Sequence, residues 1–96
     1  MNAVLLLLLA CAHEPDPVAG AEKYDVFCSS CHGADGTAGV QVDGVAATDL
    51  GASVPTLADD VLVSVIQDGS GTMPPQQLDD DETADVIAYL REIFGG

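Results

Sequence analysis

The sequence has few basic residues: Lys23 and Arg91 stand against 16 acidic residues, and the formal net charge is −14 at pH 7. Binding to nucleic acid or to anionic lipid headgroups is therefore excluded as a main activity, because both need lysine and arginine. A protein partner would have to present a basic or neutral surface. Tryptophan is absent, and only 4% of the 96 residues are aromatic. A single domain this small is marginally stable unless a large bound group adds to its core.

The three cysteines are an odd number, which argues against a framework made only of disulfides. Two of them lie in Cys28-Ser29-Ser30-Cys31-His32, a C-x-x-C-H sequence that is the signature of c-type haem attachment. Residues three apart share a helix face, so both thiols can reach the vinyl groups along one porphyrin edge. His32 can then turn under the same ring and bind the iron. The motif predicts one covalent haem c.

Two other uses of a C-x-x-C pair fit the sequence less well. A zinc site needs four ligands, and only Cys11, His13 and His32 remain to complete one. A thioredoxin-type dithiol should lie near a βαβ pattern, and no convincing strands are predicted.

Met73 is the candidate for the second axial ligand of the iron. It is the only methionine besides Met1, and it lies in the Gly/Pro-rich stretch Gly69-Ser70-Gly71-Thr72-Met73-Pro74-Pro75. The glycines allow the backbone to pass close to a flat cofactor, and Pro74 favours an extended conformation at Met73. His13, Lys23 or an open position are the alternatives.

Hydrophobic periodicity predicts three main helices and an all-α fold. The first runs from about Val18 to Ser30 and the second from about Asp59 to Asp68, with Thr56 as its cap. The third runs from about Asp80 to Phe94, with Asp79 and Glu82 at its start and Gly95 after its end. Its expected buried face consists of Val86, Ile87, Leu90, Ile93 and Phe94. The acidic run 79–82 is interpreted as helix capping rather than as a docking patch.

Residues 33–58 show no strong periodicity and contain five glycines. A stretch of this length without structure is unusual in a compact domain unless it wraps around something. We expect it to wrap around the haem.

Residues 19–94 resemble a class I cytochrome c of the small bacterial c5/c551/c6-like kind. The resemblance rests on Tyr24, Cys28-x-x-Cys31-His32-Gly33, Asp35-Gly36, Gly69-x-Gly71-x-Met73-Pro74-Pro75 and Ile87-Ala88-Tyr89-Leu90. It implies a small all-α fold in which the first and last helices cross, with Gly20, Tyr24 and Tyr89 at the crossing. Members of the family often have a proline after the haem motif whose carbonyl accepts the proton of the iron-bound histidine. No proline lies between His32 and Pro55, so a carbonyl in the Val45 to Leu50 region is expected instead.

The N-terminus indicates export. Residues 1–10 are read as a signal peptide, because Ala3 to Ala10 is apolar but far shorter than the roughly 20 residues that span a bilayer. Leu8-Leu9-Ala10-Cys11 resembles a bacterial lipobox, which implies cleavage before Cys11 and attachment of lipid to it. The alternative is a plain cleaved signal that leaves Cys11 in a loose tail. Residues 11–18 are expected to form a flexible tether with a solvated His13, and residues 19–96 the cytochrome domain.

The expected function is the carriage of single electrons by a monohaem cytochrome anchored on the periplasmic side of a membrane. Its partners would be a redox donor and an oxidase or reductase, with no small-molecule substrate and no catalytic residues of its own. Two alternatives remain: a haem sensor or peroxide-reactive haem protein with an open sixth position, and a cytochrome subunit of a larger oxidoreductase.

Overall fold

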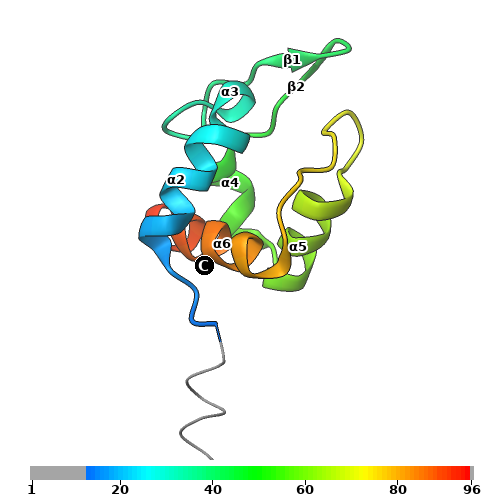
Figure 1. The fold of residues 1–96 in the computed structure, drawn as a ribbon. Helices are drawn as coiled ribbons and strands as arrows, with labels where there is room; N and C mark the ends of the chain where they lie inside the picture. Colours follow the sequence, from blue (N-terminus) through cyan, green and yellow to red (C-terminus); the bar gives the residue numbers. More distant parts are fainter. Residues whose placement is uncertain (1–12, 96) are drawn as a thin grey trace, which may run out of the picture.

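The structure is a computed structural model that describes residues 13–95 (Figure 1). Its described helices are α2 (Pro17–Phe27), α3 (Ser29–His32), α4 (Leu50–Ser53), the 3₁₀ helix η1 (Val54–Thr56), α5 (Asp59–Asp68) and α6 (Asp80–Phe94). The only sheet in this part of the chain is a two-stranded antiparallel hairpin of β1 (Gln41–Val42) and β2 (Val45–Ala46). This confirms the expected all-α fold. None of the described helices is long and apolar enough to cross a membrane.

The start of α6 is as predicted. The Asp79 side chain accepts the backbone N–H of Glu82 at 2.8 Å, and the Glu82 carboxylate accepts the backbone N–H of Asp79 at 3.1 Å. Two of the orphan N–H groups of the first turn are satisfied in this way. The helix ends at Gly95, which has a positive φ of 80°. The acidic run is therefore used for helix capping, as interpreted.

The helix predicted over Val18–Ser30 is broken in the structure. Asp16 caps α2 and Pro17 occupies its first turn, so α2 begins one residue early and ends at Phe27. Cys28 has a φ of −118°, far from the helical value, and α3 starts after it. Ser29 Oγ donates to the Asp25 carbonyl at 2.6 Å, and serine side chains that bond back to the preceding turn bend helices. This local competition for carbonyls is not visible in the hydrophobic pattern.

Two smaller expectations are wrong. Thr56 does not cap α5, because it belongs to η1 and its Oγ1 donates to the Ser53 carbonyl; Ala58 occupies the N-cap position without a side-chain bond. Ile93 is 48% exposed rather than buried. In the last turn of α6, Phe94 packs at Gly36 and Gly51, whereas Ile93 is not part of the core.

The crossing of α2 over α6 holds the two ends of the domain together (Figure 1). Gly20 lies so close to α6 that a Cβ atom there would overlap the Asp85 carbonyl. One turn further along, the rings of Tyr24 and Tyr89 are 5.5 Å apart and inclined by 51°. Gly20, Tyr24 and Tyr89 therefore meet where the family resemblance places them. The crossing covers a core of eight residues: Tyr24, Val54, Leu62, Ile66, Leu78, Val86, Ile87 and Leu90.

Arg91 ties α6 to η1 and to the start of α5. Its guanidinium donates to the carbonyls of Val54 and Leu57 and to the Asp59 carboxylate. We expect Arg91→Met to lower the free energy of unfolding by about 2 kcal/mol, because the Leu57 carbonyl loses the guanidinium donor and the Val54 carbonyl keeps only the Leu57 N–H. Urea denaturation measures this loss. Lys23→Met removes the other basic side chain, whose exposed ion pair with Glu82 should matter much less; equal losses would contradict a specific role of Arg91.

Candidate haem site

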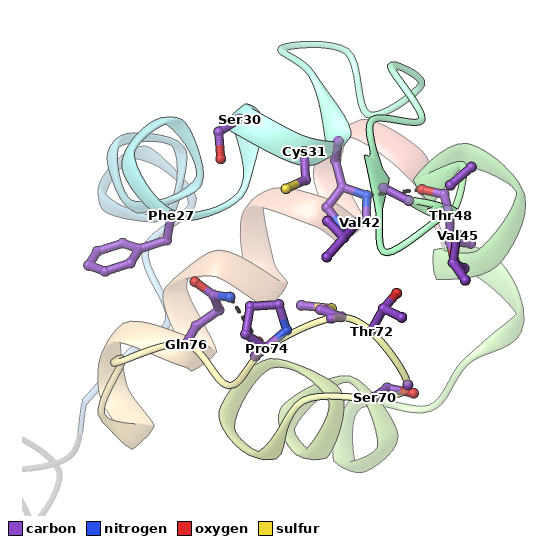
Figure 2. Close-up of a pocket in the computed structure, with 15 residues that line it drawn as sticks. Phe27, Ser30, Cys31, Val42, Val45, Thr48, Ser70, Thr72, Pro74 and Gln76 are labelled. Carbon is purple, nitrogen blue, oxygen red and sulfur yellow. Dashed lines mark hydrogen bonds between the residues drawn. The ribbon is translucent and has the colours of Figure 1, made fainter.

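The cavity lined by Cys31 and His32 lies between α3 and the segment that joins α5 to α6. It has a volume of about 330 Å³. Cys31 and Val42 lie on one wall and Thr72 and Pro74 on the opposite wall (Figure 2). Other lining residues come from the hairpin and the stretch after it, Val45 to Thr48. A smaller cavity of about 50 Å³ reaches the core and is lined by Cys28, Tyr24 and aliphatic side chains.

His32 and Met73 line both cavities, so the two cavities are adjacent, and together they are called the cleft. Cys31 lines the larger cavity and Cys28 the smaller one. Four of the residues predicted for the site are thus brought together from two segments far apart in the chain. Cys11, the predicted lipid attachment site, lies outside the described residues.

The orientation of His32 is fixed by a hydrogen bond at Nδ1 of its ring. Its side chain is largely buried, and Nδ1 donates to the Thr48 carbonyl at 2.9 Å. This hydrogen bond confirms that a carbonyl between Val45 and Leu50 faces the imidazole. Because Nδ1 carries the proton, Nε2 is the nitrogen available to a metal. None of the described residues hydrogen-bonds to Nε2.

Part of the stretch 33–58 folds back onto the C-x-x-C-H motif, and its residues Val42 and Val45 to Thr48 line the larger cavity. The backbone N–H of Ala38 donates to the His32 carbonyl at 2.8 Å, and that of Val40 donates to the Cys31 carbonyl at 3.1 Å. The Tyr24 hydroxyl donates to the Gly33 carbonyl at 2.6 Å, and burial raises the pKa of this hydroxyl to about 12. The motif is therefore held by protein contacts on several sides.

Met73 lies at the end of a tight turn. The backbones of Ser70 and Met73 exchange two hydrogen bonds of 3.0 and 2.9 Å. A Cβ at Gly69 would lie 2.6 Å from the Met73 carbonyl, so only glycine fits there. Gly71 lines the cavity and has open space beside its Cα. The first glycine thus permits the turn, and the second leaves room in the cavity.

The cleft is uncharged. No aspartate, glutamate, lysine or arginine lines either cavity, although the chain has 16 acidic residues. Burial raises the pKa of the Cys28 thiol to about 11, whereas reactive dithiols have lowered pKa values. Within residues 13–95, no group of three His, Cys, Asp or Glu side chains could hold a metal ion. Among residues 13–95, the structure supports neither a zinc site nor a dithiol centre.

These residues fit a haem c. The cleft offers a nitrogen ligand on one side, a soft sulfur ligand on another, two thiols from one short segment, and uncharged walls for a macrocycle. The sequence did not reveal which hairpin residues line the cleft. Asp43 and Gly44, with φ values of 50° and 79°, form the type of turn that an Asp-Gly pair favours, so this pair could have signalled the hairpin.

The helical fold and this cleft define a c-type cytochrome domain. Residues 15–90 match the model of a family described as cytochrome c oxidase, cbb3-type, subunit III. The chain belongs to this family, and it is a haem protein of electron transfer that carries covalently bound haem c. Neither curated proteins nor solved structures gave a match.

Proposed function

We propose that this protein is a monohaem cytochrome that carries single electrons between redox partners at a membrane. Cys28 and Cys31 form the thioether bonds to the haem, and His32 and Met73 bind its iron. The observation that carries the proposal is the cleft, which all four residues line.

The haem supplies an iron that cycles between the ferrous and ferric states. The chain holds and tunes that iron. The Thr48 carbonyl accepts the proton of His32 Nδ1, which fixes the tautomer and makes Nε2 a better donor to metal. Met73 provides a neutral, soft ligand that favours ferrous iron and raises the redox potential. If His32 and Met73 both bind the iron, no place would remain on it for a substrate.

The charge distribution supports a protein partner rather than a small-molecule substrate. The walls of the cleft carry no charge, while the chain as a whole is strongly acidic. A donor or an oxidase or reductase with a basic or neutral surface would be attracted, and acidic proteins would be repelled. Export and a lipid anchor on Cys11 complete the proposal and place the protein on the periplasmic side of a membrane.

The first test is maturation in a bacterial periplasm that attaches haem c. We expect a red protein whose mass is increased by one haem, and we expect Cys28→Ser and Cys31→Ser each to lose at least one of the two thioether bonds. Cys11→Ser is the matched control: it should keep the haem but lose the lipid mass. A colourless wild-type protein with free thiols at Cys28 and Cys31 would refute the proposed haem attachment.

The family description favours a second candidate, a cytochrome subunit of a larger oxidase. Solubilisation from native membranes in mild detergent separates the two functions. A free shuttle should elute alone, whereas a subunit should co-purify in constant ratio with a haem-copper oxidase.

A further inference from the structure

The segment before α2 is hydrogen-bonded to α6, the last helix of the domain. His13 Nε2 donates to Asp85 Oδ1 on α6 at 2.6 Å, and the backbone N–H of Asp16 donates to the same oxygen at 2.8 Å. The Asp85 side chain is only 10% exposed and that of His13 33%. This contact corrects the expectation that His13 is simply solvated.

The surroundings of His13 are almost wholly acidic. On α6, Asp81 Oδ2 lies 4.0 Å from His13 Nδ1, and Asp79 at the N-cap adds to the negative field. Glu14 and Asp16 flank it on its own segment. On α2, the charge of Lys23 acts on Asp85, and Lys23 pairs with Glu82 at 2.9 Å. A positively charged imidazole is therefore favoured at this place.

We propose that His13 and Asp85 form a latch that holds residues 13–16 on α6 and so sets how far the haem can move from the membrane. The proposal rests on the proposed lipid anchor at Cys11 for its function, but not for the latch itself. With the latch closed, only Ala12 separates Cys11 from the folded domain. With the latch open, residues 12–16 become the tether, which can reach about 17 Å when extended.

The latch responds to pH. The hydrogen bond to Asp85, with the nearby carboxylates, raises the pKa of His13 above its ordinary value of 6.5. Because the pKa of His13 is higher in the folded state than in the unfolded state, the contact has its full stability below the unfolded pKa. This stability is lost as the pH rises through the higher, folded-state pKa. Burial raises the pKa of the Asp85 carboxyl, but the hydrogen bonds from the Asp16 N–H and from His13 outweigh it and hold that pKa below its ordinary value. The contribution of Asp85 to the contact is therefore lost only as the pH falls through this lowered pKa. The latch is therefore closed below pH 6.5 and weakens as the pH rises through the raised pKa of His13.

Nuclear magnetic resonance on the reduced, full-length mature protein tests the latch directly. We expect the His13 imidazole to titrate above 6.5 in the wild type, and Asp85→Asn to lower that pKa more than Asp81→Asn does. Relaxation of the Glu14 amide should report an ordered backbone at pH 6 that becomes mobile at pH 9. His13→Lys, which stays charged, should remain ordered at both pH values, and His13→Gln should be mobile at both. A His13 pKa unaffected by Asp85→Asn, or Glu14 equally ordered in His13→Gln, would overturn the latch.

The functional consequence is measured on vesicles that contain a fluorescent headgroup lipid quenched by the haem. For the lipidated wild-type protein we expect quenching to decrease from pH 6 to pH 9, while His13→Lys stays quenched throughout. Quenching by both proteins that does not change with pH would refute the control of haem distance. If the protein does not bind vesicles at all, the lipid anchor is wrong and the magnetic resonance result still decides the latch.

Discussion

Gly20→Ala is expected to lower the free energy of unfolding by about 3 kcal/mol, against a total of about 5–15 kcal/mol for a domain of ordinary stability. By helix propensity alone this substitution inside α2 should stabilise the protein by about 1 kcal/mol. The added methyl group, however, would overlap the Asp85 carbonyl, which is backbone and cannot rotate away. The two helices would have to separate, and the contact between Tyr24 and Tyr89 would be lost with them.

Thermal and urea unfolding of the haem-loaded protein measure this effect. Gly44→Ala is the matched control, since it adds the same methyl group at a hairpin turn where nothing lies within 4 Å. Its positive φ of 79° should make that control less stable by about 1 kcal/mol. If Gly20→Ala were as stable as wild type, the close approach of α2 and α6 would be wrong.

The sequence predicted best those features that depend on neighbours in the chain. Asp79, Glu82 and Gly95 are local signals. The structure places α6 between Asp79 and Gly95, from Asp80 to Phe94, with Glu82 in its first turn. The C-x-x-C-H motif likewise predicted the cofactor class from five consecutive residues, and the family match confirms that class. Local hydrogen bonds and backbone preferences determine such features, so a short window of sequence contains the necessary information.

Features that depend on contacts between distant segments could not be predicted in the same way. The carbonyl that faces His32 belongs to Thr48, and this depends on how residues 33–49 fold back. From the sequence alone, several neighbouring carbonyls were equally good candidates. Ile93 is exposed because the last turn of α6 packs through Phe94, at Gly36 and Gly51, which are distant in the sequence. The bond between His13 and Asp85 joins residues 72 positions apart, and no pattern in a Pro-containing acidic segment signals it.

Met73→Ala is expected to change the redox site more than any other single substitution that leaves the haem attached. The variant removes a methionine thioether from a residue that lines both cavities, and under the proposed ligation it would leave a position open beside the iron. The absorption band of the iron–thioether bond should disappear from the oxidised spectrum. The redox potential should fall by an amount on the order of 0.1 V, because the thioether preferentially stabilises ferrous iron.

Carbon monoxide provides a second readout of the same substitution. The reduced wild-type protein should resist carbon monoxide if Met73 closes the sixth position, and Met73→Ala should bind it readily. Thr72→Ala is the control, because it changes the neighbouring side chain of the same cavity wall and leaves the thioether in place. An unchanged band in Met73→Ala would assign the sixth position to another residue. Ready binding by the wild type would instead indicate an open site, and the haem sensor or peroxide-reactive alternative would then replace the electron carrier.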